Sequence, residues 1–383
     1  MQRMKRRREN DKFMKRNKRW FLAALLQLLA AASLLVASRQ IDGFAAWHEA
    51  HVYPLFVNTL GRLWSIVPFS VVEIGLYALL IGLLVTLLVA LVRMVLRIVR
   101  KEAQKVRPIT TWACRTLCLA SLLLLLYTLT CGINYAAPSF SERAGYPIQA
   151  STKEELRATC EMLIDQINAE VDNITYDEAG SSVLPADAGK TARRAMQNLG
   201  QTWEFLDGYY PNPKKILVSE ILSYQFLTGV YSPFTVEANY NGDMPDMDVP
   251  ATMCHELSHL KGFMREDEAG FLAYLACTGS DDAMFRYSGA MHALTYCLNA
   301  YYDAVDGDTY RSLYYELDER AIQDRRNNSQ WWEAYRGKIS EAANTVNDTY
   351  LKANNQTDGV ASYGRMADLM IAYWRQTGQN QEE

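Results

Sequence analysis

The sequence predicts a membrane-anchored protein in which three N-terminal transmembrane helices precede an α-rich α+β domain outside the membrane. Two observations predict this organisation. Three apolar stretches, each about as long as the roughly 20 residues that a bilayer requires, fall within the first 136 of the 383 residues. The charge also divides sharply, because residues 1–136 carry a net charge of +13 and residues 137–383 carry −17. The chain therefore consists of two parts with different surroundings.

The predicted transmembrane region covers residues 20–136, and its spans are residues 20–38, 66–92 and 111–136. The first span follows a basic segment, as the apolar part of a signal peptide would. However, no small-residue cleavage site follows Ser38 and two further spans come after it, so we expect an uncleaved anchor. Glu73 and Arg93, near the ends of the second span, are expected to extend to the membrane interface.

The distribution of basic residues predicts the orientation. Residues 1–19 contain ten Lys and Arg residues, and the stretch between the second and third spans is also basic. The stretch between the first two spans has only two basic residues, Arg39 and Arg62. By the positive-inside rule, residues 1–19 form a basic cytoplasmic N-terminus and the chain beyond residue 137 lies outside. The lipid bilayer is thus an expected partner, whereas the acidic part would repel a phosphate backbone, which excludes nucleic acid.

The outer domain, residues 137–376, is predicted to be mainly helical. Apolar residues at three-to-four spacing predict a helix over 151–172, where Thr152 and Glu155 match a capping box. Further predicted elements are helices over 188–207 and 282–303, extended segments over 215–220 and 229–240, a helical region over 308–376 and a disordered tail over 377–383. Four cysteines of this part could form disulfides, but their pairing cannot be read from the sequence.

The segment from Pro250 to Gly262 contains an HExxH motif. His255 and His259 are four residues apart, so on a helix they project from one face and can hold one metal ion. Glu256 is then placed to take a proton from a water molecule that a zinc ion activates and to pass it to the leaving amine. Pro250 suits the first turn of such a helix, and Gly262 suits its end. The motif therefore predicts a zinc ion (Zn²⁺) as cofactor and Glu256 as general base.

An HExxH motif alone is a weak signal, because it also occurs in helices whose histidines only pack or face solvent. Two features strengthen it here. Two of the five histidines in the chain fall within the motif. The motif also opens a helix after extended segments, which is the order found in zincins.

The third zinc ligand is expected to be a carboxylate. The metzincin pattern HExxHxxGxxH fails at Arg265, because a cation cannot ligate zinc. Glu266 and Glu268 both remain as metal ligands of the gluzincin kind. Glu266 with Ala269 matches the ExxA part of the pattern ExxA(D/N), so we favour Glu266, although Gly270 departs from the pattern. The competing interpretation is that both acids are solvated helix charges.

A catalytic role is also predicted for Tyr287. Together with Arg286 it is the best candidate to stabilise the oxyanion of a tetrahedral intermediate, a role that needs a preorganised donor. The competing interpretation of such a tyrosine is ordinary core packing. His292 is expected to be a surface or core histidine.

Several stretches resemble a bacterial family known as domain of unknown function 3810. These are HELSHLKGF at 255–263, REDEAGFLAYLAC at 265–277 and shorter matches at 134–143, 228–239, 286–289 and 362–364. The resemblance covers nearly the whole chain. It implies a multi-pass protein of the bacterial cytoplasmic membrane with three N-terminal spans and an outer HExxH domain, and a zinc peptidase of undescribed substrate. The family often has Asn where this chain has Gly270.

These inferences predict a membrane-anchored zinc metallopeptidase whose outer domain is zincin-like, of the gluzincin type, and hydrolyses a peptide or protein substrate. Three alternatives remain. An intramembrane protease is disfavoured, because charged residues flank the motif. A non-catalytic binding or sensor domain stabilised by zinc would have a closed coordination shell. A zinc amidase acting on cell-wall peptides would share the same residues.

Overall fold

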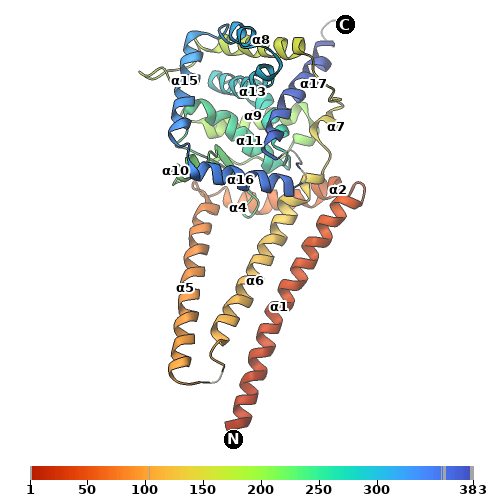
Figure 1. The fold of residues 1–383 in the computed structure, drawn as a ribbon. Helices are drawn as coiled ribbons and strands as arrows, with labels where there is room; N and C mark the ends of the chain where they lie inside the picture. Colours follow the sequence, from red (N-terminus) through yellow and green to blue (C-terminus); the bar gives the residue numbers. More distant parts are fainter. Residues whose placement is uncertain (1, 103, 355, 357–358, 380–383) are drawn as a thin grey trace.

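Three long apolar helices extend from a helix-rich domain (Figure 1). The computed structural model describes residues 2–102, 104–354, 356 and 359–379. Helices α1 (Gln2–Gln40), α5 (Val71–Val99) and α6 (Arg107–Tyr127) provide the stretches that are long and apolar enough to cross a membrane, namely Asn17–Gln40, Val71–Val99 and Arg107–Ala136. The start of α1 and the connection between α5 and α6 lie at the same end, away from the folded domain (Figure 1). The prediction of three N-terminal helices that are long and apolar enough to cross a membrane is thus confirmed.

The third apolar stretch is longer than the part of it that faces outward. Leu122 and Leu124 on α6 are exposed, as lipid-facing side chains are. The π-helical turn Thr128–Gly132 (η2) and the 3₁₀ turn Asn134–Ala136 (η3) follow, and Cys131 and Tyr135 within them are buried in the folded domain. The last residues of the predicted span 111–136 are therefore apolar because they belong to a protein core.

Short helices after the first span connect the membrane part to the folded domain: α2 (Phe44–His51), α3 (Tyr53–Phe56), the π-turn η1 (Val57–Gly61) and α4 (Arg62–Trp64). The start of α5 is also held by the domain. Glu237 accepts hydrogen bonds from the backbone N–H groups of Val71 and Val72, at 3.1 and 2.9 Å. A carboxylate there satisfies free N–H groups at the positive end of the helix.

Glu73 does not extend to a membrane interface as predicted. Its side chain is buried and accepts hydrogen bonds from the backbone N–H groups of Leu217 and Val218, at 2.7 and 3.0 Å. The reason is that Glu73 lies in the first turn of α5, where the folded domain covers the helix. Glu73 and Glu237 thus form a reciprocal joint between the second apolar helix and the domain.

Replacing Glu73 with alanine is expected to lower the free energy of unfolding by about 2–4 kcal/mol, because two backbone N–H groups lose a buried, charged acceptor. Glu102→Ala is the control: Glu102 is exposed and its oxygen lies 3.7 Å from Arg97, so its loss should change stability by less than about 0.5 kcal/mol. Chemical denaturation of the full-length protein in detergent measures both. Equal stability of the two variants would contradict the joint.

The folded domain consists of helices around a small sheet. Its helices are α7 (Phe140–Ala144), α8 (Lys153–Glu170), α9 (Ala188–Thr202), α10 (Glu220–Ser223), α11 (Val249–Lys261), α12 (Glu266–Thr278), α13 (Ala283–Ala304), α14 (Gly307–Tyr314), α15 (Glu319–Ala334), α16 (Lys338–Ala353) and α17 (Met366–Gln379), with 3₁₀ turns η4 (Glu204–Leu206), η5 (Asp246–Asp248) and η6 (Gly359–Arg365). Thr152 and Glu155 form the predicted capping box of α8. The predicted tail begins within α17, and residues 380–383 lie outside the described residues.

The sheet has three strands in the order β1-β3-β2. Strand β1 (Lys214–Lys215) is parallel to β3 (Glu237–Tyr240), and β2 (Gly229–Ser232) is antiparallel to β3. The predicted extended segment 229–240 is thus a hairpin, closed by a hydrogen bond from Val236 N to Ser232 O of 2.8 Å. The predicted segment 215–220 is mostly not a strand, because Glu73 takes the N–H groups that a ladder would use.

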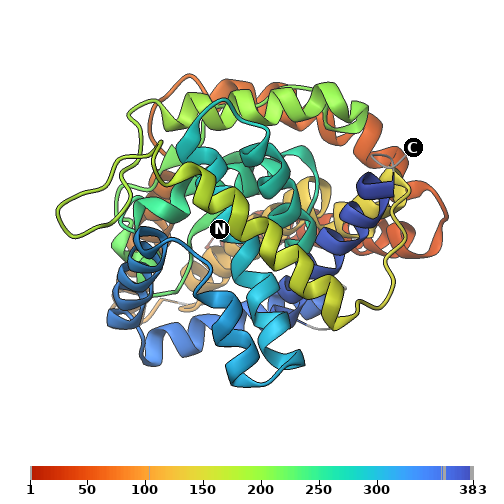
Figure 2. The same cartoon turned by 90° about the horizontal axis from the view of Figure 1, so that it is seen from above.

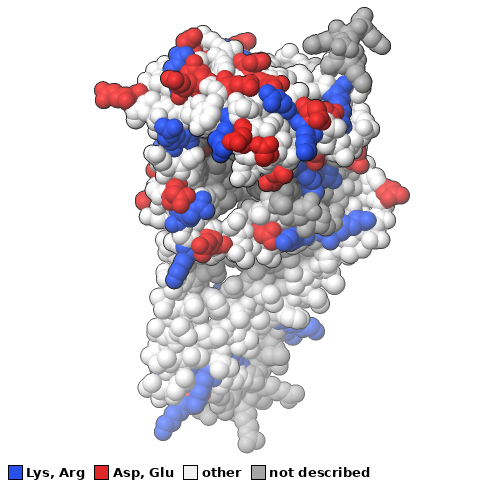
Figure 3. All heavy atoms as spheres, turned by 45° about the horizontal axis from the view of Figure 1, so that its top comes forward, with Lys and Arg blue, Asp and Glu red and all other residues white. Residues whose placement is uncertain are grey.

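The core lies where α9, α12 and α13 pack around α11, and where α8 and α17 in turn pack on α13. Leu257, Leu260, Phe271, Phe285 and Met370 are fully buried there. From above, α9, α15, α16 and α17 lie around the central helices and α8 crosses over them (Figure 2). The seven cysteines are all free, so no disulfide contributes. On the face seen in Figure 3, charged side chains gather on the folded domain and are sparse on the apolar helices.

Candidate metal centre

The HExxH segment forms α11, which is buried almost throughout. Pro250 lies in its first turn and Gly262, with φ 116°, ends it in the left-handed conformation that favours glycine. The positive φ turns the chain so that Phe263 N donates to Ser258 O at 3.2 Å. From the membrane side, the Tyr53 hydroxyl donates to Leu260 O at 2.8 Å. Both predicted helix ends are confirmed, and the helix is fixed from two directions.

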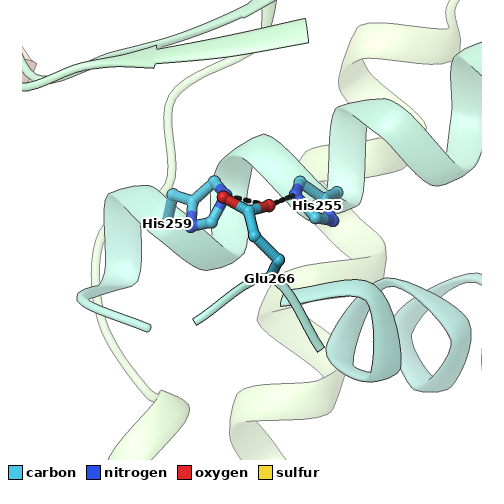
Figure 4. A group of neighbouring side chains, drawn as sticks. All are labelled: His255, His259 and Glu266. Carbon is cyan, nitrogen blue, oxygen red and sulfur yellow. Dashed lines mark hydrogen bonds and ion pairs between the residues drawn. The ribbon is translucent and has the colours of Figure 1, made fainter. Parts of the chain in front are cut away.

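His255, His259 and Glu266 form a cluster, which we call the His-His-Glu cluster (Figure 4). One ligand atom from each lies within 4.8 Å of the others. The two imidazoles come from one face of α11, and the carboxylate comes from the first residue of α12. Glu266 Oε2 lies 3.1 Å from His255 Nε2 and 3.5 Å from His259 Nε2. The carboxylate therefore faces both imidazoles.

The distances in this cluster fit a zinc ion. Zinc ligands lie about 2.0–2.2 Å from the ion, so two ligands at the tetrahedral angle are roughly 3.3–3.6 Å apart. The two measured separations from Glu266, 3.1 and 3.5 Å, are close to this range. Two imidazole nitrogens and one carboxylate oxygen are also a donor set that zinc accepts, and three protein ligands leave a fourth position open.

A backbone carbonyl orients His259. Its Nδ1 lies 2.7 Å from Phe263 O, which can only accept, so the proton of this contact is on Nδ1. Nε2, which faces Glu266, is then the nitrogen that can bind a metal ion, in exchange for the proton that it otherwise shares with Glu266. This is the arrangement that fixes the tautomer of metal-binding histidines. The left-handed turn at Gly262 places Phe263 for this contact.

The centre of the cluster favours positive charge. Burial acts to raise the pKa of Glu266, but the charge of His259 and hydrogen bonds from both imidazoles hold that pKa well below its ordinary value. Burial likewise acts to lower the pKa of His259, and the Glu266 carboxylate more than offsets it, so that the pKa rises to about 9. Burial lowers the pKa of His255. A divalent cation between these groups would be stabilised by the same carboxylate.

Glu256 points its carboxyl group into the same space. It is buried, and its Oε2 has no hydrogen-bond partner among the described residues. Burial raises the pKa of Glu256 to about 8. Strand β2 passes close to it: a Cβ atom at Gly229 would lie 2.5 Å from Glu256 Oε1 and 2.8 Å from Thr252 Cγ2, so a side chain there would displace this carboxyl group. The glycine thus leaves the space that this carboxyl group occupies.

Glu268, the other predicted metal ligand, is not brought to the cluster. It is buried, and its Oε1 accepts from Phe140 N and from Arg265 Nη1, both at 3.0 Å. Because residues two apart on a helix project about 200° apart, Glu268 points away when Glu266 faces α11. The interpretation of both acids as solvated helix charges is wrong, since both are largely buried.

Tyr287 does not reach the cluster either, which corrects its predicted catalytic role. It is fully buried and donates its hydroxyl to Asp324 Oδ2 at 3.0 Å. Arg286 forms a bidentate ion pair with Glu170 on α8, at 2.6 and 2.9 Å. Both side chains therefore connect helices of the domain, since Arg286 ties α13 to α8 and Tyr287 ties it to α15.

Two residues that sequence reasoning missed lie at the site, one turn apart on α13. His292 and Tyr296 line the same cavity as the HExxH residues. The His292 ring is 6.4 Å from the His255 ring between centroids, and its buried Nε2 has no partner among the described residues. Burial lowers the pKa of His292 to about 3, so the ring is neutral. Burial also raises the pKa of Tyr296, which keeps its hydroxyl protonated.

His292 also explains the departure from the gluzincin pattern at Gly270. A Cβ atom there would lie 3.2 Å from His292 Nε2 and 3.1 Å from Met366 Sδ. An Asp or Asn at this position would therefore have no room unless these neighbours moved. The His292 imidazole from α13 and the Met366 side chain thus limit the space at residue 270. A histidine at helical spacing from a tyrosine was the only signal in the sequence.

The cluster and Glu256 lie in the wall of a cavity of about 670 Å³. Strand β2 borders it through Gly229, Val230 and Tyr231, and α16 borders it through Asn344 and Asn347. Such a volume is within the range of sites that bind organic ligands. Since β2 is an edge strand of the sheet, the cavity also offers a strand edge to an extended chain.

A sequence model of the family described as "Protein of unknown function (DUF3810)" matches residues 48–371. The match includes the second and third apolar helices and nearly the whole folded domain. No curated protein and no solved structure matches the chain.

Proposed function

Because the chain belongs to the family of unknown function DUF3810, we propose its function from its own residues: it is a zinc-dependent metallopeptidase of the HExxH type. The main support is the convergence of His255, His259 and Glu266, whose ligand atoms lie within 4.8 Å of one another. One carboxyl oxygen of Glu256, beside them in sequence, has no hydrogen-bond partner among the described residues. The basic N-terminus and α5–α6 connection favour a cytoplasmic location for that end. The peptidase domain then lies outside the bacterial cytoplasmic membrane.

His255, His259 and Glu266 would hold the zinc ion, in the arrangement of gluzincins. The ion would supply Lewis-acid activation of a water molecule and of the scissile carbonyl. The orphaned Oε2 of Glu256 supports this use, because a buried carboxyl oxygen without a partner is costly unless a ligand or water satisfies it. The neutral His292 ring behind His255 limits how far that imidazole can turn.

Glu256 accepts a proton from the attacking water and later donates it to the leaving amine. A general base works best when its pKa lies near the working pH. The surroundings of Glu256 favour this, because its burial already raises the pKa of this carboxyl group toward neutrality. Two proton transfers by one group also require that it remain close to both reacting atoms, and the narrow space between α11 and Gly229 holds it there.

Tyr296 is the proposed donor to the oxygen that becomes negative in the transition state, in place of Tyr287. Tyr296→Phe is expected to lower kcat by about 10²-fold, the cost of removing one such donor. Tyr287→Phe is the matched control, since it removes a hydroxyl from the same helix at a position that does not line the cavity. It should keep kcat and lower only stability. Initial rates with a cleaved peptide measure both, and equal rates for the two variants would contradict this role of Tyr296.

The proposed function is tested with the purified full-length protein and a proteome-derived peptide library, analysed by mass spectrometry after incubation. We expect cleavage that a chelator abolishes and added zinc restores. Cell-wall peptides are incubated with the protein in a parallel assay, and their cleavage would show that the substrate belongs to that class. Zinc bound at about one ion per chain without hydrolysis of any peptide would refute the peptidase and support a zinc-stabilised binding or sensor domain.

A further inference from the structure

The metal-site cavity begins where the third apolar helix enters the folded domain. Cys131 and Tyr135, both within the apolar stretch Arg107–Ala136, line the same cavity as the HExxH residues. Leu124 is still exposed on α6, whereas Cys131 is buried. Since Cys131 is four residues beyond Tyr127, the end of α6, it is only about 6 Å further along the helix. Because Leu124 is seven residues before Cys131, the cavity lies about two helical turns, roughly 10 Å, from the exposed part of this helix.

Helix α16 borders this cavity with polar side chains and exposes apolar ones on another side. Asn344 and Asn347 line the cavity, so polar side chains face inward. Ile339 and Val346 are 59% and 69% exposed and lie on one side of the helix, seven residues apart. A helix on a water-exposed surface buries its apolar side and exposes its polar side. The outward apolar side of α16 thus indicates contact with lipid.

The end of α16 is attached to the ends of two apolar helices. Arg39, at the end of α1, donates to Ala353 O at 3.2 Å. Tyr127, at the end of α6, donates to Asn354 Oδ1 at 2.6 Å. Figure 1 shows α16 along the side of the domain from which the apolar helices extend. The apolar side of α16 therefore lies at the level where the three helices leave the membrane.

A second apolar surface lies at the same level, beside α5. Leu217, Val218 and Ile221 are exposed, and the backbone of the first two is held by Glu73 in the first turn of that helix. The joint fixes this surface at the start of an apolar helix. Exposed apolar side chains next to a span are typical of segments that contact the membrane interface.

We propose that α16 and the surface of Leu217, Val218 and Ile221 rest on the membrane, and that the cavity takes the membrane-proximal segment of a polypeptide anchored in the same bilayer. The substrate class rests on the proposed peptidase function. A cavity about two helical turns from the exposed part of α6 is within reach of the first residues that follow a transmembrane helix or lipid anchor. Anchoring also confines the substrate to the membrane surface, which raises its concentration at the cavity.

The position of α16 is tested without activity. Single cysteines at Ile339 and Val346, and at Glu341 and Thr345 on other sides of the helix, carry nitroxide labels in a Cys114→Ser background, because the six other cysteines are buried. The protein is reconstituted in vesicles of phosphatidylethanolamine and phosphatidylglycerol. We expect labels at 339 and 346 to be accessible to oxygen and shielded from a water-soluble nickel chelate, with the reverse at 341 and 345. Four labels equally accessible to nickel would overturn the membrane contact.

The substrate class is tested with one cleaved sequence presented in three ways: as a free peptide, directly after a transmembrane helix, and after the same helix with a long flexible spacer. In the vesicles, we expect kcat/KM to be at least about tenfold higher for the directly anchored form than for the free peptide. The double variant Ile339→Asn with Val346→Asn should reduce this advantage and leave free-peptide cleavage unchanged. Glu341→Gln with Thr345→Asn is the matched control.

The outcomes separate the two proposals. Equal kcat/KM for free and anchored forms would overturn the substrate class while the peptidase function stands. A kcat/KM that is as high for the form with the long spacer as for the directly anchored form would also overturn the substrate class. Absence of cleavage of all three forms, and of the peptide library, would refute the peptidase and with it the substrate class. The label measurements would still decide the membrane contact.

Discussion

Glu256→Gln is expected to lower kcat for peptide hydrolysis by about 10²–10⁴-fold, the usual contribution of a general base. Glutamine keeps the shape of the side chain in the narrow space beside Gly229 but cannot accept and return a proton. The zinc ligands are unchanged, because Glu256 is not among the converging atoms of the His-His-Glu cluster. Initial rates and metal content of the same preparation measure the two effects together.

The zinc content is the internal control of this variant. Zinc at about one ion per chain with lost turnover assigns the proton transfer to Glu256. Turnover close to that of the unchanged protein would refute the assigned base, and loss of both zinc and turnover would show that Glu256 acts on the metal site itself.

His259→Ala is expected to remove the bound zinc. The variant loses one of three ligands, so the loss of affinity should exceed the roughly 10–100-fold that follows removal of a group that merely orients a ligand. Elemental analysis of the purified full-length protein should show that the zinc content falls from about one ion per chain to a small fraction of that. Unfolding of the variant should also become insensitive to added zinc, since a ligand stabilises only a form that binds it.

Glu266→Gln and Glu268→Gln form a matched pair for the same measurement. The two glutamates lie two residues apart at the start of α12, and both are buried. Only Glu266 faces the imidazoles, at 3.1 and 3.5 Å, so only Glu266→Gln should lower zinc affinity. Zinc loss in Glu268→Gln with retention in Glu266→Gln would reverse the ligand assignment.

Much of the site could be predicted because its information is local. Four-residue spacing places His255 and His259 on one face of any helix, and Pro250 and Gly262 limit where that helix can run. The structure contains this helix with these ends. The three apolar stretches are local signals of the same kind, since length and composition suffice to recognise them.

Tyr287 shows where local reasoning fails. One helix carries Tyr287, which was proposed from the sequence, and His292 and Tyr296, which were missed, and sequence spacing does not show which side of the helix meets the site. The packing of α13 between α8 and α11 decides which side meets the metal centre. It places Tyr287 against Asp324 and the other two residues in the cavity.

Hydropathy likewise identified the apolar stretches but not their limits. Residues 128–136 continue the apolar stretch Arg107–Ala136, yet they are packed in the folded domain, because a protein core and a lipid bilayer both accept apolar side chains. Glu73 looked like a charge at a membrane boundary, and its partners on the chain, Leu217 and Val218, are 144 and 145 residues away.

The sequence alone thus determined the three apolar helices, the helical turn with its two histidines, and the need for a carboxylate soon after it. The tertiary structure alone decided which carboxylate turns toward the histidines, which residues of α13 join them, and how closely the cavity lies to the membrane part. The physical reason is the distance along the chain over which each kind of information acts. Spacing and composition act within one element, whereas these choices depend on the rotation of each helix against neighbours distant in the chain.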